Sequence, residues 1–212
     1  MARLFCLYTC FILLATGCGG GATPPSDPDV VATSSDTSFP FAEATTYVLA
    51  NNVAEITDPP STNVKLSEET RNLILDRVES NMNERGYGRI SESSATPPDI
   101  FIQVSVMRTT STDVYYTYWP TYWGSYYDPW YGYSTGWGTV PVPYIESSTL
   151  GSLIIEFTDP NHPNEDAQEI PSIWVGIVAG AVDNETSTGI QSRIESGIDQ
   201  AFEQSDYIRR QP

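Results

Sequence analysis

Hydrophobic residues recur at helical spacing in two stretches of the chain. In the first stretch, Ile74, Val78 and Met82 follow one another every four residues, with further apolar residues beside them. Ser67 precedes two glutamates and suits the N-cap, while Gly86 follows the last periodic residue and suits a left-handed helix end. The pattern therefore predicts an amphipathic helix that begins after Ser67 and ends just before Gly86.

The second helical stretch lies near the end of the chain. Ile190, Ile194, Ile198 and Phe202 keep the same four-residue spacing. A Thr-Ser pair shortly before them supplies candidates for the N-cap. A second amphipathic helix is predicted here.

Four further stretches have the composition and alternation of β-strands. They cover residues 44–50, 99–107, 153–158 and 173–182. In the second of them, Ile100, Ile102, Val104 and Val106 share one face, and Phe101, Gln103, Ser105 and Met107 share the other. The last two stretches are joined by a polar, acidic loop and are expected to pair antiparallel.

In chain order these elements read β-α-β-β-β-α. This order predicts an α+β fold with a mostly antiparallel sheet of about four strands. Both amphipathic helices are expected to pack on one face of that sheet, because each has a single apolar stripe to bury.

The first residues of the chain look like an export signal. Met1-Ala2-Arg3 is short and basic, and residues 4–14 are apolar but too few to cross a bilayer, which takes about 20 residues. The motif LLATGC that follows resembles the lipobox of bacterial lipoproteins, although Ala15 stands where that motif more often has leucine. Residues 1–17 are therefore predicted to be a lipoprotein signal peptide, and Cys18 the lipidated first residue of the mature protein. An ordinary secreted protein cleaved near the same place is the alternative.

The cysteine content agrees with lipidation at Cys18. Cys6 and Cys10 lie inside the predicted signal peptide, so the mature chain keeps one thiol and no internal disulfide. The residue after the cysteine is Gly19 and not an aspartate. In enteric bacteria, a lipoprotein without aspartate at this position is usually sorted to the outer membrane. By that resemblance, the protein is expected at the outer membrane, facing the periplasm.

Composition divides the mature chain into a tether and a domain. Residues 18–38 are rich in Gly, Pro, Ser, Asp and Thr and are predicted to be the lipidated cysteine followed by a flexible tether. Residues 39–212 are predicted to form a single α+β domain, with an aromatic-rich insertion at about residues 112–138.

Charge narrows the range of partners. The formal net charge is −17, Lys65 is the single lysine, and no lysine or arginine lies between Arg108 and Arg193. Nucleic-acid binding needs basic side chains that displace counterions from phosphates, so this composition excludes it. The expected partners are the membrane, through the N-terminal lipid, and a glycan or an envelope protein. No small-molecule cofactor is expected.

The insertion at residues 112–138 has an unusual density of Tyr and Trp. The whole connection exceeds the ~12–15 residues usual in compact domains, and the insertion lacks the aliphatic residues that fill a core. Tyr and Trp supply large, stiff contact area, so the insertion is predicted to form an exposed, non-enzymatic binding platform. The predicted platform residues are Trp119, Tyr122, Trp123, Tyr126, Tyr127, Trp130, Tyr131 and Trp137.

Two alternatives remain open for the insertion. The rings pack on the domain's own sheet as a structural cover, or they lie at the membrane interface, where Trp and Tyr accumulate. The lack of basic residues counts against membrane contact, because anionic headgroups attract Lys and Arg.

An enzymatic function has little support in the sequence. His162 is the only histidine and lies in a Pro-flanked turn, without a serine or cysteine motif beside it. Glu165 and Asp166 form an acid pair that would suit a weakly metal-dependent hydrolase. The same loop offers calcium ligands but lacks the spacing of helix-loop-helix calcium sites. These candidate ligands are Asp159, Asn161, Asn164, Glu165 and Asp166. We predict no catalytic residue and no metal site, and expect the protein not to be an enzyme.

Several short motifs occur in an order that resembles one known family. They are ATTY after Phe41, ERGY at 84–87, PPDIFIQV at 97–104, GSLIIEFTD at 151–159 and IWVG at 173–176, followed by the terminal amphipathic helix. Together they resemble the bacterial lipoprotein family known as domain of unknown function 4136, over roughly Phe39 to Tyr207. The sequence departs from the family pattern at Val48-Leu49 and in the length of the insertion. The resemblance implies a cell-envelope lipoprotein with no established activity.

Overall fold

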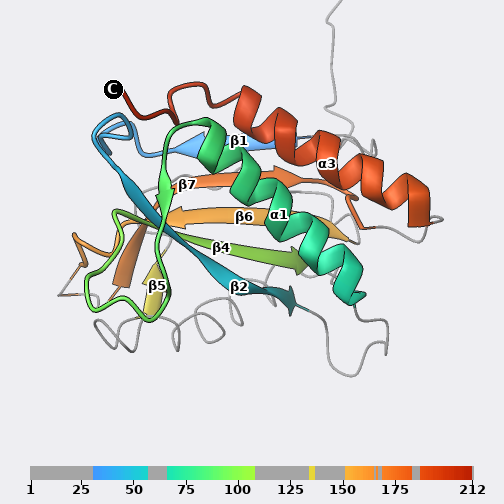
Figure 1. The fold of residues 1–212 in the computed structure, drawn as a ribbon, viewed down its shortest axis with the longest axis horizontal. Coiled ribbons are helices and arrows are strands. Elements are labelled where there is room, and N and C mark those ends of the chain that lie inside the picture. The colour runs from blue at the N-terminus through green and yellow to red at the C-terminus, as the bar shows by residue number, and fades with distance from the viewer. Residues whose placement is uncertain are drawn as a thin grey trace, which may run out of the picture.

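The computed structural model describes residues 31–56, 66–107, 134–136, 151–164, 166, 169–182 and 187–211 of the chain. In these residues two helices, α1 (Glu68–Glu84) and α3 (Ser187–Glu203), lie side by side over one face of a sheet (Figure 1). Neither helix is long and apolar enough to cross a membrane. The arrangement is the layered α+β fold that the order of the predicted elements indicates.

The sheet is mixed. The strands in the described part of the chain are β1 (Val31–Ser35), β2 (Thr46–Ile56), β3 (Gly88–Arg89), β4 (Ile100–Met107), β5 (Ser134–Gly136), β6 (Ser152–Thr158) and β7 (Glu169–Val178). The order is β1-β7-β6-β4-β2-β3, and β5 pairs in parallel with β7 beside this path. The pairs β1–β7, β7–β6 and β6–β4 are antiparallel, whereas β4–β2 and β2–β3 are parallel.

The predicted sheet therefore needs correction, while the α+β class and the two helices on one face are confirmed. The sequence predicts a mostly antiparallel sheet of about four strands. β2 and β4 are instead parallel neighbours, because α1 forms a crossover that carries the chain back before β4 begins. The predicted antiparallel pairing of the two strands that flank the acidic loop, β6 and β7, is confirmed.

The sheet also begins earlier in the chain than the sequence predicts. β1 lies inside residues 18–38, the segment predicted to be a flexible tether, and pairs with β7 along its whole length. Its sequence, Val-Ala-Thr-Ser-Ser, has little to bury, but backbone hydrogen bonds to a neighbouring strand do not require hydrophobic side chains. The tether prediction is wrong for residues 31–35, and residues 18–30 lie outside the described part of the chain.

Both predicted ends of α1 are confirmed. Ser67 is the N-cap, and its Oγ accepts a hydrogen bond from the Thr70 backbone N–H at 3.1 Å. At the other end Gly86 has φ 89°, and the Tyr87 backbone N–H donates to the Met82 carbonyl at 3.2 Å. A glycine adopts this left-handed conformation at little cost, so Gly86 ends the helix and turns the chain toward the sheet.

The core lies between the helices and the sheet. Trp174 and Phe157 of the sheet and Phe202 of α3 form its aromatic centre. Ring centroids lie 4.6 Å apart between Phe157 and Trp174 and 5.5 Å apart between Trp174 and Phe202. The indole N–H of Trp174 donates to Ser205 Oγ at 2.9 Å, so the polar group of this buried ring is satisfied. Aliphatic residues of the central strands surround this centre, including Leu49, Ile100, Ile102, Val104, Leu153 and Ile155.

An ion pair and a hydrogen bond join the two helices above this core. Arg77 of α1 forms an ion pair with Asp199 of α3, and Asn81 Nδ2 donates to the same carboxylate at 3.0 Å. Burial opposes ionisation of Asp199, but the hydrogen bonds from Arg77 and Asn81 outweigh it and lower its pKa.

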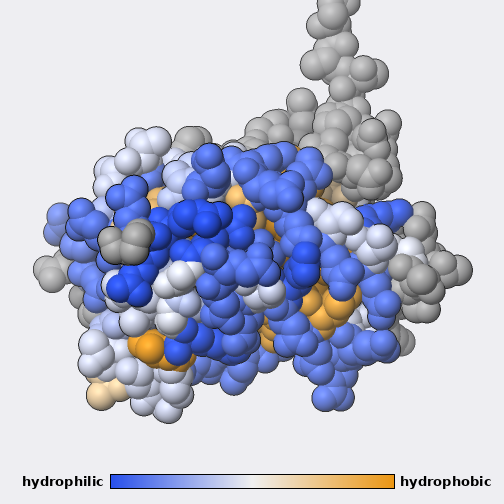
Figure 2. Space-filling model, turned by 45° about the horizontal axis from the view of Figure 1, so that its top comes forward, coloured by the Kyte–Doolittle hydropathy of each residue, from blue (hydrophilic) through white to orange (hydrophobic). Residues whose placement is uncertain are grey.

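Most of the surface on the side shown in Figure 2 is hydrophilic, with only small hydrophobic areas.

Candidate functional site

The predicted platform and the predicted lipidation site lie outside the described residues. This holds for Trp119, Tyr122, Trp123, Tyr126, Tyr127, Trp130, Tyr131 and Trp137, and for Cys18. The structure does describe where the connection between β4 and β6 leaves the sheet and rejoins it. β4 and β6 stay paired up to Met107 and Ser152, and the Gly151 N–H donates to the Met107 carbonyl at 2.9 Å. Residues 108–150 thus connect two points that a hydrogen bond already joins.

The sheet face opposite the helices mixes polar and apolar side chains, and they are buried. Phe101, Gln103, Ser105 and Met107 of β4 belong to this face, and Ser152, Ile154, Glu156 and Thr158 of β6 lie beside them. Glu156 is 0% exposed and lies opposite Gln103. Burial of a carboxylate is costly unless polar groups surround it, so this is an uncommon position for a glutamate. α1 and α3 do not cover this face, because both pack on the other one.

The acidic loop after β6 forms a closed turn. Asp159 Oδ1 accepts a hydrogen bond from the Asn161 backbone N–H at 2.9 Å, and Asp159 Oδ2 lies 2.6 Å from His162 Nδ1. Asn161 Nδ2 donates to the Pro98 carbonyl at 2.8 Å, which ties the loop to the start of β4. The side chain of His162 is 82% exposed, as expected for the solvated turn that its flanking prolines indicate.

In the described part of this loop, the side chains considered as calcium ligands do not come together around one point. Asp159 and Asn161 use their side chains within the turn and against Pro98, and Glu165 lies outside the described residues. Within the described ranges, no three His, Cys, Asp or Glu side chains come together in a way that could hold a metal ion. The separation of the acid pair Glu165 and Asp166 also falls outside the described residues.

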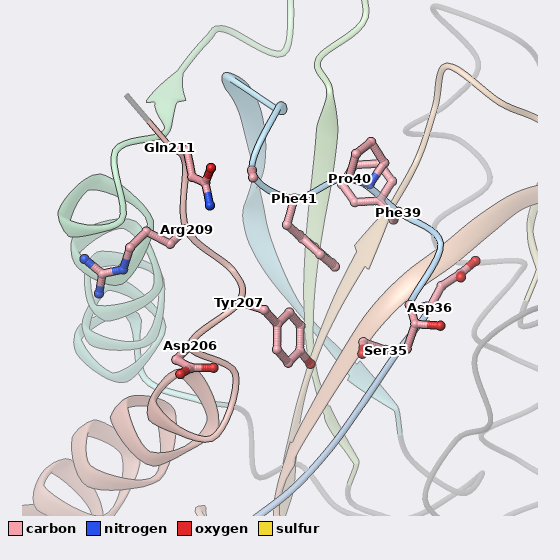
Figure 3. A pocket seen from close by; sticks show the side chains of 11 residues that line it. Ser35, Asp36, Phe39, Pro40, Phe41, Asp206, Tyr207, Arg209 and Gln211 are labelled. Carbon is pink, nitrogen blue, oxygen red and sulfur yellow. The ribbon is translucent and has the colours of Figure 1, made fainter.

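A hollow that the sequence does not predict lies where the two ends of the domain meet (Figure 3). Its volume is about 560 Å³. One wall comes from the segment that follows β1, and the other from the segment that follows α3. The lining residues are Ser35, Asp36, Thr37, Phe39, Pro40, Phe41, Ala42, Asp206, Tyr207, Arg209 and Gln211.

Three aromatic rings make the apolar part of this hollow. Ring centroids lie 4.8 Å apart between Phe39 and Phe41, in an edge-on arrangement, and 5.6 Å apart between Phe41 and Tyr207. Phe41 is 5% exposed and belongs to the core, whereas Tyr207 is 43% exposed. Contacts between rings at such distances stabilise a pair beyond the area that it buries. Because Phe41 is buried and Tyr207 is exposed, the aromatic cluster runs from the core to the solvent.

Hydrogen bonds fix both walls of the hollow. The backbone N–H of Gln211 donates to the Ala42 carbonyl at 3.2 Å, and the Tyr87 hydroxyl donates to the Phe41 carbonyl at 2.8 Å. Burial raises the pKa of the Tyr87 phenol further above physiological pH, where the group is a donor. A hollow held in this way is preformed, and a ligand does not have to order it.

Two other hollows are each lined by an arginine that already forms a hydrogen bond or an ion pair within the protein. One, of about 500 Å³, lies between β1 and α3, and there Arg193 Nη1 donates to the Gly180 carbonyl at 3.1 Å. The other, of about 450 Å³, lies beside Arg89 of β3, which forms an ion pair with Glu79 of α1. Neither offers the aromatic surface of the hollow between the two domain ends.

The chain matches one protein family and resembles solved structures. The family described as Domain of unknown function (DUF4136) matches residues 31–205. The crystal structure of a DUF4136 family protein from Bacteroides thetaiotaomicron is similar over 87% of this chain and 100% of that chain, with 24% sequence identity and a TM-score of 0.59. A PelC dodecamer structure from Paraburkholderia phytofirmans is similar over 86% of this chain and 99% of that chain, with 11% identity and a TM-score of 0.39. No curated protein matches the chain.

Proposed function

We propose, from the premise that the chain belongs to the DUF4136 family of domains of unknown function, that it is a lipid-anchored binding protein of the bacterial cell envelope. The motif LLATGC, with Cys18 at its end, and the apolar segment before it support the anchor. Gly19 after this cysteine supports the outer membrane, facing the periplasm. The acidic composition favours a glycan or an envelope protein over nucleic acid as the partner. The proposal assigns no catalytic role to any residue.

One observation carries this proposal: the connection between β4 and β6 is much longer than the structure of this strand pair requires. The Gly151 N–H already donates to the Met107 carbonyl at 2.9 Å, where β4 and β6 end their pairing. A turn of a few residues would close such a hairpin. Residues 108–150 instead contain four of the five tryptophans of the chain. Because Tyr and Trp dominate the energetics of many binding surfaces, a binding role explains their concentration in this connection.

The test is retention of the purified protein on cell-wall and polysaccharide fractions and on immobilised envelope proteins. Both proteins that are compared carry Cys18→Ser, so that a lipid does not contribute to their retention. In this background, Trp119, Trp123, Trp130 and Trp137 are changed together to Ala. We expect the variant to bind at least about tenfold more weakly, because the loss of even one aromatic anchor of an interface costs about 1–2 kcal/mol or more. The fraction that retains the wild type identifies the class of partner.

The four-tryptophan variant contains its own control for folding. Trp174 is then the only indole left, and it is 0% exposed in the core. Emission from Trp174 that is typical of a buried indole shows that the domain is intact, so a loss of retention reports on the binding surface. Equal retention of the variant and the wild type contradicts the platform.

A second role for the insertion is favoured by the buried sheet face. Phe101, Ile154 and Glu156 are excluded from solvent, although both described helices lie on the other face. A cover over this face would remove apolar surface from water. In this alternative the insertion closes over the sheet and serves the stability of the domain.

Denaturation of the same four-tryptophan variant separates the two roles. Loss of a buried Trp side chain costs about 3–5 kcal/mol, so a cover formed by these rings would leave the variant strongly destabilised. Four exposed platform residues would change the free energy of unfolding by about 2 kcal/mol at most, because a surface substitution usually changes it by about 0.5 kcal/mol or less. Strong destabilisation together with unchanged binding would favour the cover over the platform.

A further inference from the structure

The hollow between the two domain ends has the chemistry of a cation site. We propose that it binds a small organic cation, an ammonium ion that carries apolar substituents. All of its lining residues belong to the described part of the chain, and none belongs to the aromatic insertion. The inference therefore does not depend on the proposed role of that insertion.

The aromatic wall is the first reason. A cation is attracted to the face of an aromatic ring when it lies within about 6 Å of the ring centroid. Tyr207 is 43% exposed, and Phe39 is partly buried against the same cluster. In Figure 3 the rings of Phe41 and Tyr207 point into the same space, bordered on its other side by the segment of Ser35 and Asp36. Apolar substituents on the ligand would contact the same rings.

Carboxylates from both walls are the second reason. Asp206 follows the C-terminal end of α3 and precedes Tyr207, while Asp36 directly follows β1. Ser38 donates to Asp36 Oδ1 from its backbone N–H at 2.8 Å and from its Oγ at 2.6 Å, so this carboxylate is held in place. Two negative charges at the border of a hollow attract a cation and repel an anion.

The neighbouring arginines leave this negative charge in place. Arg209 lines the hollow, but in Figure 3 its guanidinium points away from the rings. Arg85 is buried below, where its Nη1 donates to Asn81 Oδ1 at 2.9 Å and its guanidinium lies 4.8 Å from the centroid of the Phe202 ring. Neither guanidinium therefore lies against the rings that line the hollow.

The size of the hollow suits a small molecule. Its volume of about 560 Å³ lies within the range of about 300–1,000 Å³ that is common for small-molecule sites. The hydrogen bonds from Gln211 to Ala42 and from Tyr87 to Phe41 hold the walls before any ligand binds. Binding then does not have to overcome the entropy of ordering the site.

The experiment is an NMR titration of the purified protein with choline and with 3,3-dimethylbutan-1-ol. The two probes have the same shape, but only choline carries a charge. We expect choline to shift the ring signals of Tyr207 and Phe39 saturably. The neutral alcohol should bind about tenfold more weakly, since it keeps the apolar contacts and loses the attraction to the rings and carboxylates. Vesicles of phosphatidylcholine, titrated in parallel, distinguish a lipid headgroup from a free cation as the source of the ammonium group.

Four variants test the assignment residue by residue. Tyr207→Ala should weaken choline binding about tenfold, whereas Tyr207→Phe should leave it within about twofold because the ring face remains. Asp206→Asn should weaken it about threefold or more, as expected for a charge near the surface. Glu203→Gln is the matched control, because it removes an acid of α3 that does not line the hollow, and it should leave binding unchanged.

Three results with the wild type and Tyr207→Ala would overturn the proposal. They are equal affinity for choline and the neutral alcohol, unchanged choline binding in Tyr207→Ala, and the absence of a saturable shift in the wild type. Should Tyr207→Ala fail to fold, Asp206→Asn keeps the packing of the aromatic cluster and still tests the charge. Choline binding that is equal in Asp206→Asn and Glu203→Gln would also contradict recognition of the cation by this hollow.

Discussion

Gly197 lies where α3 packs on β7. A Cβ added at this position would come within 2.3 Å of Val178 Cγ1. Helix propensity alone would make Gly→Ala stabilising by about 1 kcal/mol, but overpacking a core costs about 1–3 kcal/mol. We therefore expect Gly197→Ala to lower the free energy of unfolding by up to about 2 kcal/mol, measured by urea denaturation.

Val178→Ala is the matched second change at this contact. Because it removes the methyl groups that the new Cβ meets, the double variant should be more stable than the sum of the two single changes indicates. A Gly197→Ala protein that is more stable than the wild type contradicts the close packing of α3 on β7.

Asp99 joins the start of β2 to the start of β4. Its Oδ2 accepts hydrogen bonds from the backbone N–H groups of Thr45 and Thr46, at 2.8 and 2.9 Å, and from both of their hydroxyls. Burial acts to raise the pKa of Asp99, but these hydrogen bonds outweigh it, so the pKa is lowered. Because the folded pKa lies below the unfolded one, the stabilisation is complete above about pH 4 and is lost as the pH falls through the folded pKa.

Asp99→Asn should therefore lower the free energy of unfolding by about 1–3 kcal/mol at neutral pH. The difference from the wild type should shrink as the pH is lowered toward about 2, because Asp99 of the wild type is then protonated as well. Asp76→Asn removes an exposed acid on α1 and is the control for charge alone. A difference between wild type and Asp99→Asn that stays constant with pH contradicts a role for the charge.

At the residue scale, features set by local sequence were predictable and those set by distant contacts were not. His162 lies in the exposed turn that its flanking prolines indicate. The hollow depends on the contact of Phe41 with Tyr207, which come from opposite ends of the domain. Each ring is an ordinary aromatic residue in its own segment, so no local pattern reports their contact.

Among the elements, α1 gives the clearest test of a local signal. Ser67→Ala removes the side-chain acceptor of the Thr70 N–H and should lower the free energy of unfolding by about 1 kcal/mol. Ser80→Ala is the control on the same helix, since Ser80 Oγ donates to the exposed Glu84 side chain. Alanine favours a helix interior, so this control should not destabilise the protein. Equal denaturation midpoints for both variants contradict the N-cap.

The sequence predicts the elements that have an apolar period of their own, and misses the elements that depend on a neighbour. α1, α3, β4 and β6 each show such a period, and all four are found close to their predicted bounds. β1 and the two-residue β3 are short and polar and exist through backbone pairing with β7 and β2. Strand direction also depends on the neighbour. The parallel pairing of β2 with β4 follows from the crossover through α1, which periodicity within a single strand does not report.

For the whole molecule, the predicted anchor at Cys18 gives a direct test of localisation. Cys18→Ser should move the protein from the membrane fraction to the soluble fraction, because the variant loses the proposed lipid anchor. Fractionation of cells that produce either form measures this. An alternative cleavage by the ordinary signal peptidase predicts instead that both forms are soluble, and that result would contradict a lipid anchor.

The proposed function rests on the claim that the indoles of the aromatic insertion face solvent. Hydroxyl-radical footprinting of the folded protein measures this for each tryptophan separately, and Trp174, which is 0% exposed, is a buried reference in the same chain. The account predicts fast oxidation of the four tryptophans of the platform and slow oxidation of Trp174. The four are Trp119, Trp123, Trp130 and Trp137. Oxidation of all four as slow as that of Trp174 would contradict the account and leave the insertion as a cover of the sheet.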